Sequence, residues 1–571
     1  MSLPKGPAHL ATDVLVIGSG AAGMAAALAA VREGARVLLA DRSLIGRSGA
    51  TIMAQMTVAV ALGEETPDDW EAHFADTMKA GRGLCDANLA RLVCERGPAA
   101  IRQLDAWNVG WARGPDGHLR QTQAPGHDRP RCVYVDFLST GPAVAKTLRA
   151  QVLKNPQIVR VGDLCITDLV QTDGAVGGAV GFSMADGRAV SIAAAAIVLA
   201  TGGVTRIYRR NSASANMGGD GHALALRAGA ELMDMEFVQF FPIGHLAPRL
   251  VGMDPIMWDP FRYKLGGRLL NGEMKEFMSH YDNVQENDRY VVTRDKATYG
   301  ILKEVEAGRG TPAGGAYLSF QHIPEEKLRE AFGPVIDRLA ENGIDLTKMP
   351  VEVAPIAHYH MGGVRVDEAL ETRVRNLFAA GELVAGANGA NRLSGNAITE
   401  ALVFGEIAGQ GAAQRALSEA RTVWHPAAAS AALELVEAVS GETDFNATHA
   451  IADLQDVMAD LVGPFRTRQG LEVALEKVAK LKDASGDQPP GRSEPYNSAR
   501  LDWFDLRSML SVAEAIIRAA LSREESRGGH QREDFPGMDE RWAFHQTVAL
   551  GHDDLILGRA PVHAEALAET V

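Results

Sequence analysis

Cysteine is scarce in this chain of 571 residues. The four cysteines, Cys85, Cys94, Cys132 and Cys165, are scattered without CxxC or CxxCH spacing. This pattern argues against zinc, an iron–sulfur cluster or attached haem in this chain, and we expect no metal. Most of the four should be reduced residues of the core.

Long hydrophobic runs and basic tracts are missing as well. The longest apolar stretches, such as residues 192–200, span about half of what a membrane helix needs, and the first 13 residues lack the apolar core of a signal peptide. The formal net charge is −15, from 72 acidic against 57 basic residues, so a nucleic-acid surface is not expected. We expect a cytoplasmic protein without a transmembrane segment, in which an anionic substrate needs a local basic pocket.

The overall composition is that of an ordinary globular protein. Apolar residues make up 46% of the chain and charged residues 23%, which excludes a disordered or fibrous protein. A chain of this length is too long for one core and should divide into two to four domains.

A glycine-rich turn near the N-terminus predicts a dinucleotide site. The apolar strand 13–17 runs into Gly18-Ser-Gly20-Ala-Ala-Gly23 and an Ala-rich helix, which together place a pyrophosphate at a helix N-terminus. A second strand, 36–41, ends in Asp41, where a ribose hydroxyl needs an acceptor. Residues 13–41 therefore predict a β-α-β unit.

The remaining patterns indicate how the chain is organised. Residues 47–55 are rich in small side chains and predict a turn whose backbone can approach a ring closely. Apolar spacing predicts helices over 68–108 and strands over 170–197, and the strand 197–201 ends in a glycine turn. A mixed composition over 242–353 indicates an inserted domain, and helical patterns follow residue 416. These helical patterns cover 426–439, 451–461, 471–481 and 506–524, with a Pro/Gly/Ser-rich link at 484–495.

Several strings, in order and over nearly the whole chain, resemble the flavoprotein subunits of succinate dehydrogenase and fumarate reductase, and L-aspartate oxidase. They include Ala379-Ala-Gly-Glu382, which with the glycine turn indicates FAD rather than another dinucleotide. The others are Ala200-Thr-Gly-Gly203, Gly219-Asp-Gly221, Arg227-Ala-Gly-Ala230, Asp234-Met-Glu-Phe-Val-Gln-Phe240, His358-Tyr-His-Met-Gly-Gly363, Gly389-Ala-Asn-Arg-Leu-Ser-Gly-Asn396 and Arg523-Glu-Glu-Ser-Arg-Gly-Gly-His530.

The resemblance implies an α/β fold with a Rossmann-like FAD-binding domain, an inserted α+β capping domain that closes over the flavin, and a C-terminal helical domain. We place these at 1–241 and 354–416, at 242–353, and at 417–571. It also implies that Gly18, Gly20, Gly23 and Asp41 hold the ADP half of FAD, while Ser48, Thr51, Gly202, Asp220, Glu382 and Asn396 lie along the ribityl chain and isoalloxazine. The other expected FAD-binding residues are Arg42, Ala50, Gln55, Ala200, Thr201, Ala397 and Ile398.

The sequence departs from the family pattern at three places. The membrane-associated members carry flavin on a His in Ser-His-Thr, and here Ala50 stands before Thr51, so FAD should be noncovalent. After Phe-Val-Gln-Phe the family has a His that helps to bind a substrate carboxylate, and this chain has Phe241. In the capping domain, the register on Gly266-Gly267 and Leu270-Asn271 places the family's proton-transferring arginine on Tyr263, and a slip of one residue would place it on Arg262.

Two expected substrate anchors remain, Arg392 and His358. A guanidinium can bind one carboxylate in two parallel charge-assisted hydrogen bonds, and His358 can donate another. We predict hydride transfer between a substrate carbon and flavin N5, with Tyr263 or Arg262 exchanging a proton at the neighbouring carbon. Because a second carboxylate would face Phe241 and Ile243, succinate and fumarate should be poor substrates.

Three functions stay open at this point. The first is a soluble dehydrogenase or reductase acting next to a carboxylate, and the second is an oxidase of the L-aspartate-oxidase type. The third is a flavin electron-transfer subunit, as in adenylylsulfate reductase, whose partner carries the clusters. A separate electron-transfer partner and a homo-oligomer are both compatible with the sequence.

Overall fold

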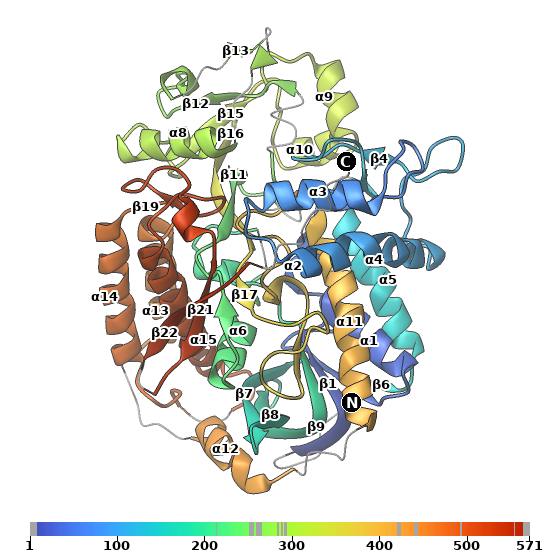
Figure 1. Cartoon of the computed structure of the whole chain (residues 1–571). Coiled ribbons are helices and arrows are strands. Elements are labelled where there is room, and N and C mark those ends of the chain that lie inside the picture. Colours follow the sequence, from blue (N-terminus) through green and yellow to red (C-terminus); the bar gives the residue numbers. More distant parts are fainter. Residues whose placement is uncertain are drawn as a thin grey trace. The chain divides into compact units, whose positions relative to one another are not determined.

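The computed structural model describes residues 8–136, 138–212, 214–250, 256–258, 265–281, 285–286, 289–290, 294–418, 424–438, 444–491, 494–552 and 554–562 (Figure 1). The chain divides into two compact units. The first consists of Met1–Arg209, Ala213–Val238 and Tyr359–Val571, and the second of Arg210–Ser212 and Gln239–His358. The finer domain boundaries given above remain a prediction beside this division.

The main sheet of the first unit is built around the expected β-α-β unit. Strand β1 (Ala8–Ile17), helix α1 (Ala21–Arg32) and strand β2 (Val37–Ala40) follow one another, and β1 pairs with β2 in parallel. The strand order is β6-β2-β1-β9-β8-β7, and β18 also pairs with β9. The added strands are β6 (Ile158–Val161), β7 (Leu164–Thr172), β8 (Ala175–Ser183), β9 (Ala189–Leu199) and β18 (Leu377–Ala379).

Parallel pairing brings three distant segments to one edge of this sheet. Ile17 of β1 is in register with Leu199 of β9, and Leu199 is in register with Ala379 of β18. Since parallel strands end at the same edge, the segments that follow residues 17, 199 and 379 emerge side by side. These segments are the glycine turn and the two Ala-containing strings found in the sequence.

Helix α1 packs against α11 (Asn396–Ser418), as Figure 1 shows. The contact is close because α11 presents glycines. A Cβ at Gly405 would lie 2.4 Å from the carbonyl oxygen of Ala22, and one at Gly409 would lie 2.2 Å from that of Ala26. The helices α3 (Trp70–Ala80), α4 (Ala87–Ala106) and α5 (Thr140–Lys154) also belong to this unit, and Asp69 and Asp86 cap the first two.

The C-terminal region contains the expected helices and also a hairpin that the sequence patterns did not predict. The helices are α12 (Ser430–Glu437), α13 (Ala447–Leu461), α14 (Arg468–Ser485) and α15 (Ser498–Ser522). Strands β21 (His545–Leu550) and β22 (Leu555–Ala560) then join β10 (Leu232–Met233) and β17 (Gly363–Val364) in the order β17-β10-β21-β22. The C-terminal region is therefore not helical throughout.

The second unit is an α+β body. Its sheet has the order β11-β16-β15-β12, formed by β11 (Val238–Ala247), β16 (Val351–His360), β15 (Ala316–Ser319) and β12 (Arg268–Leu270). Its helices are α8 (Arg294–Glu306), α9 (Glu325–Phe332) and α10 (Val335–Glu341). Trp258, Phe320 and Phe332 form an aromatic core in which each pair of ring centroids lies 5.8–6.0 Å apart.

Shorter elements complete both units. The segment 47–55, expected to be a turn, contains a short helix, α2 (Gly49–Met53), of which no residue is fully buried. Small side chains thus permit one helical turn here without supplying a core. The others include β3 (Val58–Ala59), β4 (Gln121–Thr122), β5 (Cys132–Val133), α6 (Asp220–Arg227), β13 (Gln285–Glu286), β14 (Arg289–Tyr290), β19 (Phe465–Arg466), β20 (Gln531–Arg532) and the single-turn helices η1 (Thr205–Ile207), η2 (Met278–His280), η3 (Gly381–Leu383), η4 (Pro426–Ala429) and η5 (Glu540–Trp542).

The four cysteines are free and buried, as expected. Burial raises the pKa of Cys94, Cys132 and Cys165 to about 12, which keeps these thiols protonated and unreactive. Among the helices that the structure describes, none combines the length and the apolar character that a bilayer crossing requires.

Candidate active site

The glycine turn forms a cradle at the start of α1. Gly18 has φ +102°, and a Cβ there would lie 2.3 Å from the carbonyl oxygen of Ala200. A Cβ at Gly23 would lie 1.9 Å from the carbonyl oxygen of Gly18, so the helix rests directly on the turn. A Cβ at Gly20, by contrast, would meet nothing closer than Thr51 Oγ1 at 3.5 Å. The open position at Gly20, ahead of the helix N-terminus, fits a pyrophosphate.

Asp41 braces this turn. Its Oδ2 accepts hydrogen bonds from the Ser19 amide at 2.8 Å and the Ser19 hydroxyl at 2.5 Å. Its Oδ1 accepts from the amide and hydroxyl of Ser43 at 2.8 and 2.9 Å, and the Ser43 hydroxyl lies 2.6 Å from that of Ser48. A ribose hydroxyl would have to replace one of these donors, so the ribose role of Asp41 stays a prediction.

Arg42 is tied to the C-terminal helices. Its Nη1 lies 2.7 Å from Asp505 Oδ1 on α15, and Asp505 also binds Arg206. Burial opposes the charge of Arg42, but the Asp505 carboxylate outweighs that effect and raises the pKa of Arg42. In this structure Arg42 therefore links the loop after β2 to α15.

The segment around α2 is held by backbone and hydroxyl contacts. The Ala21 amide of α1 donates to Thr51 Oγ1 at 2.9 Å, and the Gly49 amide donates to Ser214 Oγ at 3.0 Å. Ala50 lies between these two contacts and is half-buried, whereas Gln55 is buried. Thr51 thus joins α2 to the N-terminus of α1, where Gly20 leaves space in the cradle.

Buried polar atoms without partners lie at the end of β9 and the start of α6. Among the described residues, neither Thr201 Oγ1 nor Asp220 Oδ1 has a hydrogen-bond partner. A Cβ at Gly221 would lie 2.0 Å from Thr201 Oγ1, which places the two segments in contact beside Gly202. Burial raises the pKa of Asp220 to about 6. Because buried polar groups usually have partners, these atoms fit a hydrogen-bonding cofactor.

Glu382 and Asn396 have different environments. Glu382 Oε1 accepts a hydrogen bond from the His360 amide at 3.2 Å, and burial raises the pKa of Glu382 to about 8, which leaves it largely neutral at pH 7. The Asn396 side chain is bound by His73 Nε2 at 2.8 Å and Thr77 Oγ1 at 3.2 Å. Its side chain is thus used within the protein, so a cofactor contact at 396–398, including Ala397 and Ile398, would fall to the backbone at the start of α11.

Arg392 lies in the first unit, inside a buried polar cluster. Its guanidinium carbon is 4.4 Å from the centroid of the Tyr359 ring, in cation–π geometry. The Tyr359 hydroxyl donates to Glu400 Oε2 at 2.6 Å, and Asn388 Nδ2 donates to the same oxygen at 2.8 Å. Arg392 was predicted from the sequence, whereas Glu400 and Asn388 were missed. The available signal was Glu400 itself, an acid among apolar residues in the first turns of α11.

His358 belongs to the second unit. Its Nδ1 lies 2.7 Å from Ser212 Oγ, and its ring meets that of Phe241 edge-on with centroids 5.1 Å apart. Ser212 was not predicted from the sequence, although a hydrogen-bond role for His358 requires such a partner. Arg262 and Tyr263 lie outside the described residues.

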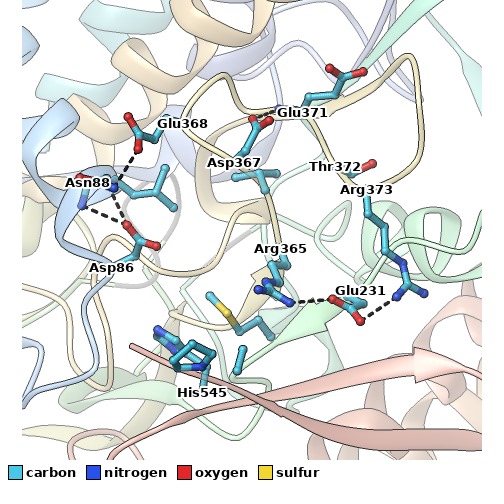
Figure 2. A pocket seen from close by; sticks show the side chains of 15 residues that line it. Asp86, Asn88, Glu231, Arg365, Asp367, Glu368, Glu371, Thr372, Arg373 and His545 are labelled. Atoms are coloured by element: carbon cyan, nitrogen blue, oxygen red, sulfur yellow. Dashed lines mark hydrogen bonds and ion pairs between the residues drawn. The ribbon is translucent and has the colours of Figure 1, made fainter. Parts of the chain in front are cut away.

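A separate cavity of about 500 Å³ lies in the first unit (Figure 2). Glu231 binds both Arg365 and Arg373 there, at 2.9 and 2.7 Å, and Asn88 donates to Glu368 at 2.8 Å. Its lining differs from the residues predicted for FAD or substrate, and these charges are paired with one another. We therefore do not place the active site in this cavity.

Comparisons with known proteins identify the family of this chain. Residues 13–398 match the FAD binding domain family, and residues 451–570 match the fumarate reductase flavoprotein C-terminal family. The chain is 36% identical over 532 residues to one of the subunits of the CoM/CoB fumarate reductase of Methanothermobacter marburgensis, covering 93% of this chain and 95% of that protein. It is 32% identical over 559 residues to L-aspartate oxidase of Streptomyces coelicolor, covering 95% of this chain and 92% of that protein.

A solved structure extends the similarity to three dimensions. Sdh1 of Mycobacterium smegmatis, in complex with UQ1, superposes with a TM-score of 0.88 at 34% identity and covers 98% of this chain and 95% of that one. The matched regions contain the glycine turn, the Glu382 string and Arg392. The chain therefore belongs to the fumarate reductase, succinate dehydrogenase and L-aspartate oxidase flavoprotein family and is an FAD-dependent oxidoreductase.

Proposed function

We propose that this oxidoreductase acts on a small substrate with one carboxylate, at a carbon–carbon bond next to it, and that Arg392 binds that carboxylate. The observation that carries the proposal is the buried guanidinium of Arg392, stacked on Tyr359 and supported by Glu400. A buried cation held in one orientation suits a planar anion, because the two can form parallel charge-assisted hydrogen bonds.

The residues of the cradle would hold FAD noncovalently. Gly18, Gly20 and Gly23 shape the helix N-terminus, and Thr201 and Asp220 offer buried polar atoms. When bound, FAD supplies two-electron chemistry by exchanging a hydride with a substrate carbon. Ala50 has no nucleophilic side chain to attach it. Acid precipitation should therefore release all of the flavin into the supernatant, and flavin retained in the pellet would show a covalent bond.

His358 is the second proposed contact to the substrate. Ser212 Oγ lies 2.7 Å from Nδ1 and holds the imidazole in place, and Nε2 is the proposed donor to the substrate. Phe241 presents a ring against His358, and an aromatic ring cannot solvate a second carboxylate. Tyr263 or Arg262 is the proposed proton-transfer group.

An anaerobic stopped-flow experiment tests this substrate class. Reduced enzyme would be mixed with crotonate, which has one carboxylate, or fumarate, which has two, and the return of flavin absorbance followed. We expect crotonate to react at least about tenfold faster, because a desolvated second carboxylate costs a kcal/mol or more. An equal or faster reaction with fumarate would refute the one-carboxylate preference. Failure of every carboxylate in a wider panel would refute the function.

Two relatives each support a different alternative function. The similarity to L-aspartate oxidase supports an oxidase that acts on a carbon–nitrogen bond. Rapid formation of peroxide when reduced enzyme meets air would favour it, and slow reoxidation would favour the dehydrogenase or reductase. The Methanothermobacter relative is one chain of an enzyme with subunits, which supports a partner chain here. Copurification of a cysteine-rich electron-transfer protein would favour that arrangement.

A further inference from the structure

The buried cluster around Arg392 contains a carboxylic acid, Glu400, that a simple anion-binding site does not need. Glu400, on α11, is 1% exposed, and its Oε2 receives hydrogen bonds from Tyr359 and Asn388. Its other oxygen, Oε1, is buried and has no partner among the described residues. A carboxylate that is half satisfied in the core is costly, so its presence calls for an explanation.

The groups that act on the pKa of Glu400 include one tyrosine, one amide and one arginine. Tyr359, at the end of β16, donates to it, and Arg392, in the loop before α11, attracts its negative charge. Glu382, on η3, is a further acid of this cluster: the charge of Arg392 lowers its pKa and that of Glu400 raises it. Burial outweighs the favourable contacts and raises the pKa of Glu400 to about 7, while the pKa of Tyr359 is raised well above its ordinary value by burial.

We propose that Glu400 is a positioning residue that sets the strength with which Arg392 attracts a substrate carboxylate. It does so in two ways. Through the Tyr359 hydroxyl it fixes the ring on which the guanidinium lies, and through its own charge it offsets the positive field of Arg392. The inference rests on the proposed function of Arg392 and goes beyond it by naming the group that regulates it.

The direction of the pH effect follows from charge. Protonated Glu400 no longer offsets the positive field of Arg392, so a carboxylate binds more tightly. Ionised Glu400 neutralises part of that field and repels the incoming anion. Affinity for a carboxylate should therefore weaken as the pH rises through 7, and a bound carboxylate should in turn favour the protonated form of Glu400.

The test is a titration of FAD-loaded enzyme with crotonate and with malonate, followed by the change in flavin absorbance, at pH values from 6 to 8.5. Wild type should show a dissociation constant that rises about fivefold or more across this range. Glu400→Gln keeps the shape and the hydrogen-bond acceptor for Tyr359, and should bind tightly without the weakening near pH 7, so that only a dependence near pH 8, where Glu382 ionises, remains. Tyr359→Phe keeps the ring but removes a donor that favours ionised Glu400, so the weakening should move to higher pH.

Glu406→Gln is the matched control, because Glu406 lies on the same helix at the surface and pairs with Arg32. It should retain the wild-type pH profile. The inference is overturned if Glu400→Gln, with FAD bound, follows the wild-type profile, or if Tyr359→Phe leaves the midpoint in place. If wild type binds neither crotonate nor malonate, the proposed function of Arg392 fails. If wild type binds a probe but Glu400→Gln follows the same pH profile, only the role of Glu400 fails.

Discussion

At the scale of single residues, the first unit places ionisable groups where water cannot solvate them. Arg392 is 8% exposed, and Glu400 is more deeply buried. Groups in such places interact more strongly than they would at the surface, since the surrounding dielectric is low. Small changes in shape or charge at these positions should therefore have large effects on function.

Arg392 can be tested with two substitutions of graded severity. Arg392→Lys keeps the charge but loses the planar fork and the stacking on Tyr359, and should lower kcat/KM by about 100-fold. Arg392→Ala should lower it by about 1,000-fold or more. Both should retain FAD, measured as absorbance near 450 nm per protein. Arg468→Lys, at an exposed arginine, is the control, and a colourless Arg392→Ala protein would assign Arg392 a structural role instead.

The glycines of the cradle give a second pair of variants at this scale. Gly18→Ala places a Cβ 2.3 Å from a backbone oxygen at a positive φ, and should destabilise the fold by about 3 kcal/mol or more. Gly20→Ala meets only Thr51 at 3.5 Å, so the folded chain should tolerate it. If the pyrophosphate lies there, Gly20→Ala should fold normally, by circular dichroism and melting, but lose FAD. Full FAD occupancy in that variant would contradict the placement.

At the scale of elements, local patterns predicted the β-α-β unit and most helices well. The alternation and the glycine turn of residues 13–41 are short-range signals, and β1, α1 and β2 follow them. The hairpin β21–β22 was missed although its strands are neighbours in the sequence and pair with each other. Most residues of β22 are exposed, so this strand lacks the alternation of apolar and polar residues that predicts a strand.

The residues of the candidate site also fall into two groups, those that the sequence indicated and those that only the structure brings together. The local pattern indicated the glycine turn, and the family resemblance pointed to Arg392 and Glu382, whose roles stay predictions. Ser212 and Glu400 were missed, because each becomes meaningful only through a partner in three dimensions, His358 for the first and Tyr359 for the second. The ion pair between Arg42 and Asp505 could not be predicted from the sequence either. It makes Arg42 a tie between elements, while the cofactor-binding role of Arg42 stays a prediction.

That tie leads to a prediction about α15. Asp505 is the shared anion for Arg42 and Arg206, and its side chain is 5% exposed. Asp505→Asn leaves two largely buried guanidinium groups without their carboxylate, which should cost about 3–5 kcal/mol and lower the melting temperature by several degrees. Asp502→Asn, on the same helix but bonded to Thr448 at the surface, should change the melting temperature little. Equal melting temperatures for the two variants would show that the contacts of Asp505 with Arg42 and Arg206 make no net contribution to stability.

At the scale of the whole molecule, buried ionisable groups act on stability in opposite directions. Burial raises the pKa of Glu382 to about 8, so the folded protein holds a proton that the unfolded chain releases near pH 4.5. The stabilisation from that proton is present at low pH and is lost as the pH rises toward 8. Burial lowers the pKa of His73 to about 3 and that of His360 to about 4, so these rings stay neutral in the folded state.

The histidines should therefore control the acid side of the stability curve. Below pH 6.5 the unfolded chain binds protons that folded His73 does not bind until about pH 3, so stability falls through this window by up to about 1.4 kcal/mol per pH unit for this group. His73→Gln keeps an amide that can hydrogen-bond to Asn396 but cannot titrate. In melting experiments between pH 4 and 8, this variant should lose less stability toward acid than wild type and should match it in the decline above pH 7. His118→Gln, at an exposed position, should follow the wild-type curve throughout. If His73→Gln loses as much stability toward acid as wild type, burial does not hold His73 neutral. The acid sensitivity of the fold would then arise at other groups.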